Sequence, residues 1–170
     1  MAIYARRPKT QFTPCPEGLH PAVCVDVVDL GIQKTTWGEK HQVELRWQIE
    51  DRNPATNKRF DVRKWYTLSL HEKASLRKDL ECWRGRKFTD DEADEFDLEK
   101  LLGANCQLQV IHTLGGEGTV YANVQAIVPQ NKKMGALRPE DYIRQKDRDA
   151  KPANGGKPED DSEPDDSVPF

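Results

Sequence analysis

Apolar and polar residues alternate in several short segments between residues 20 and 130. Successive side chains of a β-strand point to opposite faces, so this period of two predicts strands with one buried and one wet face. β-Branched residues, which favour strands, are frequent in the same segments. The pattern predicts five strands, at residues 22–30, 41–50, 60–69, 106–112 and 120–128.

The alternation also predicts which side chains enter the core. We expect to find there Val43, Leu45, Trp47 and Ile49 of the second strand, Phe60, Val62, Tyr66 and Leu68 of the third, and Val120, Ala122, Val124, Ala126 and Val128 of the last. We expect the opposite faces to meet water through Gln42, Glu44, Arg46, Gln48, Glu50, Arg63, Trp65, Thr67, Tyr121, Asn123 and Gln125. A slip of one residue in the register would exchange the two faces.

The period becomes helical between the third and fourth predicted strands. The segment 69–72 (SLHE) has the form of a capping box, which favours the start of a helix. Gly85 is placed to end that helix, and shorter turns are expected to begin at Thr89 and after Asp97. The longer helix would bury residues at helical spacing, namely Leu76, Leu80 and Trp83.

Three strands, a helical insert and two further strands form the element order of the OB-fold, a five-stranded, partly open barrel. The sequence therefore predicts a mainly β protein with an OB-fold domain at residues 20–130. We expect an N-terminal arm at 1–19, a partly ordered extension at 131–150, and a disordered acidic tail at 151–170, which is rich in Pro and Gly. OB-folds bind oligonucleotides on the face of strands 2 and 3.

Charge is unevenly distributed along the 170 residues. The chain has 26 basic and 29 acidic residues and a net charge of -3, yet residues 159–170 hold six acids and no base, so residues 1–158 carry +3. A mildly basic body with an acidic tail is compatible with a nucleic-acid partner. Because the apolar runs are short and the N-terminus has no signal-peptide pattern, we expect a cytoplasmic protein.

The residue types that carry catalysis or bind metals are scattered. No cysteine or histidine pair has the close spacing of a zinc site, so we expect no metal and no other cofactor. The acids at 90–95 fit the start of a helix, and the glycines at 115–118 fit a hairpin turn better than a phosphate loop. We therefore expect no enzymatic activity, and we interpret the cysteines as small buried hydrophobic residues: Cys15, Cys24, Cys82 and Cys106.

We expect some aromatic residues on the solvent-exposed surface, where the free energy of burying their rings is lost and another interaction must compensate for it. Trp65 shares the outward face with Arg63, and stacking on a nucleic-acid base would compensate for its exposure. Trp37 lies beside a glycine in the loop after the first strand, and Tyr121 points outward from the last strand. Trp47 and Trp83 are assigned to the core instead. A bulge that buries Trp65 is the alternative interpretation.

Basic residues surround these rings in the sequence. Cations for phosphates among aromatic rings for bases are typical of a single-strand binding groove. An ordinary solvated surface is the alternative, since Glu44 and Glu50 are expected on the same face. The candidate nucleic-acid contacts are Trp37, Arg46, Lys58, Arg59, Arg63, Lys64, Trp65 and Tyr121.

The chain ends in Asp165-Asp166-Ser167-Val168-Pro169-Phe170. This end resembles the acidic tip of bacterial single-stranded DNA-binding proteins, which docks on replication, repair and recombination enzymes. The resemblance implies that Phe170 is the anchor, Pro169 a rigid spacer, Val168 an apolar contact, and Asp165 and Asp166 steering charges. Ser167 stands where an acid is common and Val168 where a larger residue is common, which should weaken the contact. A solubility tail is the other interpretation.

The body is similar to small single-stranded DNA-binding proteins of phages and prophages over residues 18–130, through GLHPAVCVDVVDLG, RKWYTLSLHEKASLRKDLECWRGRKF and FDLEKLLGANCQLQVIH. This implies an OB-fold that coats single-stranded DNA without sequence specificity, in a bacterial or phage-infected cell. A strand-annealing recombination factor, a nuclease and a protein-binding adaptor remain alternatives. The choice between DNA and RNA and a homo-oligomeric state stay open.

Overall fold

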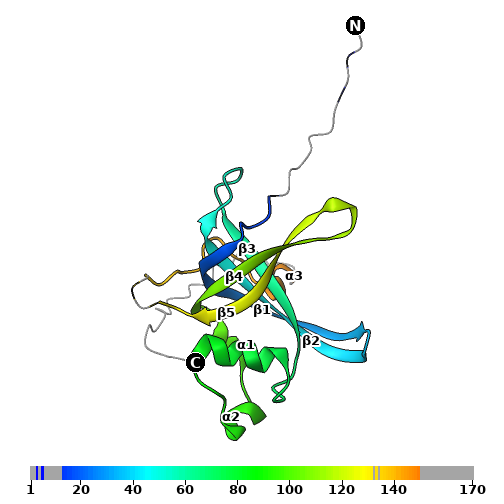
Figure 1. Ribbon diagram of the computed structural model, residues 1–170, viewed down its shortest axis with the longest axis vertical. Coiled ribbons are helices and arrows are strands. Elements are labelled where there is room, and N and C mark those ends of the chain that lie inside the picture. Colours follow the sequence, from blue (N-terminus) through cyan, green and yellow to red (C-terminus); the bar gives the residue numbers. More distant parts are fainter. Residues whose placement is uncertain (1–2, 4, 6–12, 132, 134, 150–170) are drawn as a thin grey trace, which may run out of the picture.

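The computed structural model describes residues 3, 5, 13–131, 133 and 135–149. Within them the protein is mainly β, as predicted, with five strands in one antiparallel sheet (Figure 1). The strands extend further toward the first turn than the alternation indicated, so the first hairpin is long. They are β1 (Gly18–Thr35), β2 (Gly38–Arg52), β3 (Arg59–Thr67), β4 (Asn105–Leu114) and β5 (Val120–Pro129).

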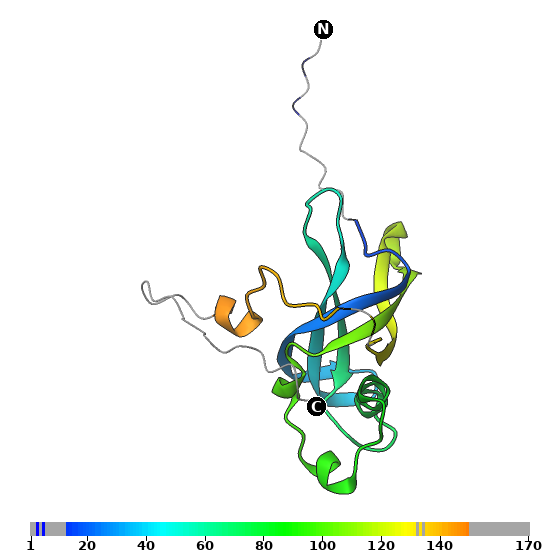
Figure 2. The ribbon, with the colours of Figure 1, turned by 90° about the vertical axis from the view of Figure 1, so that its left-hand side faces the viewer.

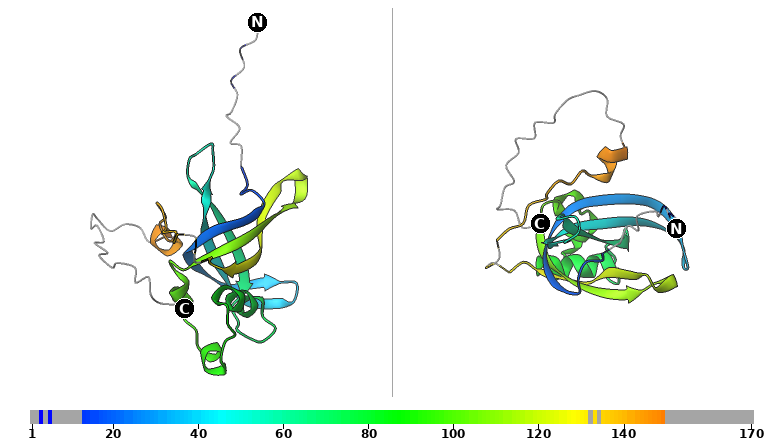
Figure 3. Two further views of the ribbon diagram at one scale, coloured as in Figure 1. Left: turned by 60° about the vertical axis from the view of Figure 1, so that its left-hand side comes forward. Right: turned by 90° about the horizontal axis from the view of Figure 1, so that it is seen from above.

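The strand order across the sheet is β3-β2-β1-β4-β5, so β1 is central and pairs with both β2 and β4. The β1–β2 register shifts between Cys24 and Asp26 and again between Asp29 and Gly31. Such irregularities bend and twist a strand. The sheet is curved, and the edge strands β3 and β5 approach each other (Figure 3). The β1–β2 and β4–β5 hairpins project from the same side of the molecule (Figures 1 and 3).

Helix α1 (Ser75–Arg84) packs against β3 and β5, below the strands in Figure 1. It buries Leu76, Leu80 and Trp83, as their spacing predicts. Gly85 ends it at a φ of 73°, a left-handed conformation that glycine adopts without a steric penalty. The shorter α2 (Asp90–Asp94) and the 3₁₀ turns η1 (Leu98–Leu101) and η2 (Gly116–Gly118) complete the elements up to β5.

The start of α1 differs from the prediction. The helix begins at Ser75 rather than Ser69, and the preceding residue, Ala74, provides no side-chain cap. The Ser69 hydroxyl instead accepts a hydrogen bond from the His71 backbone N–H at 3.2 Å. Short polar side chains stabilise turns in this way, so the serine marks a turn before the helix. The predicted caps at Thr89 and Asp97 are confirmed.

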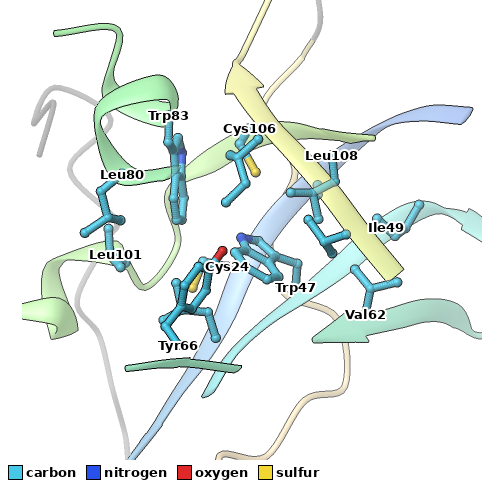
Figure 4. Packing of buried hydrophobic residues seen from close by; sticks show 14 of the residues in the cluster. Cys24, Trp47, Ile49, Val62, Tyr66, Leu80, Trp83, Leu101, Cys106 and Leu108 are labelled. Carbon is cyan, nitrogen blue, oxygen red and sulfur yellow. The ribbon is translucent and has the colours of Figure 1, made fainter. Parts of the chain in front are cut away.

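The hydrophobic core lies between the concave side of the sheet and α1 (Figure 4). The alternation predicted its β2 contribution correctly, and Phe60, Val62 and Tyr66 of β3 are buried as expected. Trp47 and Trp83 are core residues, also as predicted, with ring centroids 6.1 Å apart. The indole N–H of Trp83 donates to the Asn105 carbonyl at 2.9 Å, which ties α1 to β4.

Some predicted core positions are wrong. Leu68 lies just beyond the end of β3 and is exposed. In β5 a register shift opposite Gln109 and Val110 leaves Gln125 without a partner, and Ile127 is buried where the simple alternation favoured Ala126 and Val128. The extra residue of a bulge exchanges the two faces of a strand beyond it.

The cysteines follow the prediction except for one. Cys15, Cys24 and Cys106 are buried, whereas Cys82 is on the exposed side of α1. Burial raises the pKa of the Cys24 thiol to about 12 and that of Cys15 to about 11, so both remain protonated. Cys15 also shows that the folded body begins before residue 20, since it lies in the core and β1 starts at Gly18.

Residues 138–149, which we call the strap, cross the outer side of β1, β2 and β3 and end in α3 (Gln145–Asp149). Figures 2 and 3 show this segment on the side of β1 and β2 that faces away from β4 and β5. The strap belongs to the predicted extension at 131–150. Among the helices of the described residues, none combines the length and apolar character needed to cross a bilayer.

Candidate nucleic-acid interface

Five of the side chains predicted to face water on β2 and β3, together with Asp61, lie opposite one another in the antiparallel ladder. The register pairs Glu44 with Trp65, Arg46 with Arg63, and Gln48 with Asp61. These six residues, which we call the outer row, share the sheet face opposite the core. They run from the hairpin end of β2 toward the β2–β3 loop. The prediction that the whole row is exposed is wrong for Glu44 and Gln48, which are buried.

Trp65 is the exposed aromatic residue of the outer row. Its side chain is outside the core, and the residue is 54% exposed, so the alternative in which a bulge buries it is ruled out. The indole N–H donates a hydrogen bond to the carboxylate of Glu44. The ring is therefore held by its edge while much of its surface remains in contact with water.

Glu44 is the buried acid beneath this ring, with 2% of the residue exposed. Its carboxylate also accepts a hydrogen bond from the guanidinium of Arg46, and the guanidinium of Arg63 lies 3.9 Å away. A buried carboxylate is tolerated when it is paired and hydrogen-bonded. Glu44 therefore fixes Trp65 and Arg46 and does not add an exposed negative charge to the face.

Arg63 and Arg46 differ in their availability although they are cross-strand neighbours. The side chain of Arg63 is 67% exposed, whereas that of Arg46 is 16% exposed. Arg46 donates to Gln145 of the strap at 3.1 Å and to the Tyr142 hydroxyl at 3.4 Å. Arg63 is thus the guanidinium of this pair that is open to a ligand.

The remaining cations of β3 and the loop before it are divided in the same way. Lys58 is exposed in the β2–β3 loop. Arg59 donates to the Arg138 carbonyl at 2.7 Å and lies 3.1 Å from the Glu140 carboxylate, both in the strap. Lys64 does not share the outer row. It is directed toward α1 and pairs with Asp79 at 2.9 Å.

Trp37 occupies the turn between β1 and β2 and is 88% exposed. Lys34 and Lys40, which flank it in the sequence, are also exposed. Six residues of β2 separate the turn from Glu44, which corresponds to about 20 Å along an extended strand. The structure therefore does not bring Trp37 together with Trp65, and a ligand that contacts both must be extended.

Tyr121 lies on β5, next to the β4–β5 turn, and is half exposed. Its ring lies so close to Gly115 that a Cβ atom at that position would be 2.2 Å from a ring carbon. The glycine thus makes room for the ring at this hairpin. Tyr121 belongs to the opposite edge of the sheet from Trp65, so the aromatic candidates are distributed over different elements.

Sequence reasoning missed Asp26, the residue that anchors the strap to β1. Asp26 is 1% exposed, and its carboxylate accepts hydrogen bonds from the Tyr142 hydroxyl at 2.8 Å, the Gln145 backbone N–H at 2.8 Å and Arg144 at 3.1 Å. Burial alone would raise the pKa of Asp26, but these hydrogen bonds lower it below its ordinary value. The sequence signal that could have identified it is an acid in the middle of a β-branched, mostly apolar segment.

A polar cavity of about 320 Å³ separates part of the strap from the sheet. Its walls come from β2, the β2–β3 loop, the start of β3 and the strap, and they carry both signs of charge. The charged residues among them are Arg52, Lys58, Arg59, Asp61, Glu140, Asp141 and Arg148.

The predicted tip residues Asp165, Asp166, Val168, Pro169 and Phe170 lie outside the described residues. Among the residues that are described, no group of three or more His, Cys, Asp or Glu side chains is arranged to hold a metal ion. Comparison of the chain with models of known protein families and with curated protein sequences finds no match.

Proposed function

We propose that this is a non-catalytic protein that binds and protects single-stranded DNA without sequence specificity during phage or prophage replication, recombination or repair. Trp65 carries the proposal: an indole ring, anchored by its N–H and more than half exposed, stands beside the open guanidinium of Arg63. Stacking on a base is worth about 1–3 kcal/mol and tolerates any base, because every base has a π face.

We further propose that the curved sheet is an OB-fold. The central β1 paired with β2 and β4, the approach of β3 to β5, and α1 against β3 and β5 support it. In that fold the strand 2–3 face binds oligonucleotides, and the outer row lies on β2 and β3. Trp37 and Tyr121 at the tips of the hairpins would extend the stacking surface, and the acidic tip at Asp165–Phe170 would recruit partner proteins.

Titration with oligo-dT tests the proposal directly. Tryptophan fluorescence should be quenched to saturation, and the affinity should be lower at about 200 mM than at about 50 mM salt, with a log–log slope of about -0.7 for each phosphate contact. Duplex DNA should compete poorly, and poly-U measures the preference for DNA over RNA. Absence of both quenching and retardation of oligo-dT in gels would overturn the proposal and favour a protein-binding adaptor.

Substitution of the exposed Arg63 tests whether the bound DNA passes along β3. Arg63→Ala should weaken oligo-dT binding and make the salt slope shallower by about 0.7, the equivalent of one phosphate contact. Arg86→Ala is the matched control, because Arg86 is also exposed but lies after α1, outside the outer row. Equal losses of oligo-dT affinity in the two variants would indicate a general effect of charge instead of a phosphate contact at β3.

A further inference from the structure

The strap engages the cationic side chains of the β2–β3 surface. Glu140 pairs with Arg52 at 2.7 Å and lies 3.1 Å from Arg59, and the backbone of Glu140 exchanges hydrogen bonds with the side chain of Gln48. Tyr142 and Gln145 accept hydrogen bonds from Arg46. The cations that the strap occupies thus extend from the middle of the β2–β3 face, at Arg46, to the β2–β3 loop, at Arg52 and Arg59.

The strap presents oxygen atoms to these cations. A carboxylate, a backbone carbonyl, a side-chain amide and a phenol oxygen accept the guanidinium hydrogen bonds. Phosphate oxygens are acceptors of the same kind, and guanidinium groups recognise them well. A single strand that followed β3 from Trp65 toward Arg59 would therefore compete with the strap for the same donors.

The strap is attached mainly by polar contacts. None of its residues 138–149 is buried, and Ile143 is exposed. The polar cavity described above lies beneath Glu140, Tyr142 and Arg148. Apolar burial, the main source of strong packing, therefore contributes little to the attachment.

Release of the strap would return its partners to water without leaving them unpaired in the core. Asp26 and Arg46 lie on the outer side of the sheet, and the strap itself supplies the hydrogen bonds to Asp26. Arg46 would keep its hydrogen bond to Glu44, and Trp65 would keep its anchor. The strap can thus leave while Glu44, Arg46 and Trp65 stay hydrogen-bonded to one another, and Gln48 loses its hydrogen bonds to Glu140.

We propose that the strap is an intramolecular competitor that covers half of the DNA-binding face and is displaced when a single strand binds. This inference rests on the function proposed above. In the free protein Trp65 and Arg63 are accessible, so single-stranded DNA binds to them first. Displacement of the strap then makes Arg46, Arg52 and Arg59 available to phosphates.

Hydrogen exchange of residues 138–149 in the full-length protein, measured with and without saturating oligo-dT, tests the displacement. Exchange should rise when oligo-dT binds. Asp26→Asn should raise it without DNA and should tighten oligo-dT binding, by about tenfold if the strap covers nine of ten free molecules. Asp147→Asn is the matched control, because it changes the net charge equally at an exposed position of α3.

The outcomes separate the two proposals. Binding of oligo-dT with unchanged or lower exchange in the strap would overturn the competition and make the strap a fixed wall of the site, while the proposed function would stand. Equal affinities of the Asp26→Asn and Asp147→Asn variants would also overturn it. If Asp26→Asn fails to fold, hydrogen exchange of the unaltered protein with and without oligo-dT still shows whether the strap is displaced. No binding by the unaltered protein or by either variant would overturn both proposals.

Discussion

Trp65 and Glu44 lie directly across from each other in the β2–β3 ladder, and each determines the state of the other. The buried carboxylate needs donors, and the indole N–H is one of them. In return, the hydrogen bond restricts the rotation of an exposed ring, so less conformational entropy is lost when a base stacks on it. The pair therefore combines a structural contact at the edge of the ring with a ring surface that remains exposed to solvent.

Substitutions of Trp65 separate the contribution of the ring surface from that of the hydrogen bond to Glu44. Trp65→Ala removes the stacking surface and should weaken oligo-dT binding by about 1–3 kcal/mol, or roughly 5- to 150-fold. Trp65→Phe keeps an aromatic ring but loses the N–H, so it should retain most of the affinity. Fluorescence anisotropy of a labelled oligo-dT measures both, with circular dichroism as the folding control. An equal loss in the two variants would assign the effect to the hydrogen bond.

At the residue scale the sequence predicted the side of the sheet better than the degree of exposure. The alternation placed Glu44, Gln48 and Trp65 on the outward face, and all three are there. It did not predict that Glu44 and Gln48 are buried, because a segment about ninety residues further along the chain contacts Gln48, and Glu44 is enclosed by its neighbours. Contacts over such separations leave no periodic signal in the sequence.

Helix α1 shows how one element closes the core. Trp83→Ala would leave a cavity beside Trp47 and remove the hydrogen bond to Asn105, and it should lower the free energy of unfolding by about 3–5 kcal/mol. Cys82→Ala, at the adjacent exposed position, should change it by less than about 0.5 kcal/mol. Urea unfolding followed by circular dichroism compares the two. Similar midpoints would contradict the assignment of Trp83 to the core.

The attachment of the strap should depend on pH through Asp26. Its pKa is lower in the folded protein than the ordinary value of 3.8, so the ionised form stabilises the docked strap. This stabilisation is present above that ordinary value and is lost as the pH falls through the lowered pKa. The backbone N–H of Gln145, which donates to Asp26, is a direct reporter of the titration.

Nuclear magnetic resonance can follow this reporter between about pH 2 and pH 6, a range that brackets the ordinary aspartate pKa. The Gln145 amide shift should titrate with a midpoint below 3.8, and the inflection should be absent in Asp26→Asn. A midpoint at or above 3.8 would contradict the role of the hydrogen bonds. Tyr142, Arg46, Arg144 and Glu99 surround the site, and Glu99 pairs with Arg144 at 2.8 Å, so Glu99→Gln is the control for this neighbouring carboxylate.

At the element scale, the existence and type of each strand and helix were easier to predict than the residues at which it begins and ends. The five strands follow from hydrophobic alternation and from runs of β-branched residues, and the buried face of α1 follows from helical spacing. The bulge in β5 and the start of α1 were missed, because a bulge depends on the pairing of two strands and because Ser69 fits a turn as well as a helix cap. The strap could not be located, since its contacts are polar and non-periodic.

Across the whole molecule, charge is separated along the chain. Residues 1–158 carry a net charge of +3 and residues 159–170 six acids. An anionic segment tethered to a basic body has a high effective concentration near any cationic surface. The acidic end is therefore expected to compete with DNA for Arg63 and Lys58, whereas the strap competes for Arg46 and Arg59 through specific hydrogen bonds.

Deletion of residues 159–170 should tighten oligo-dT binding at low salt, because it changes the net charge from -3 to +3. The gain should shrink as salt rises, since the attraction of the tail is screened over about 10 Å at 0.1 M. Deletion of Phe170 alone keeps all six acids and should leave the affinity unchanged, which separates charge from tip recognition.

Combined with Asp26→Asn, the tail deletion should give an additive gain if the two segments occupy different cations. An unchanged or weaker affinity after the tail deletion at low salt would show that the acidic end does not compete for the β2–β3 face.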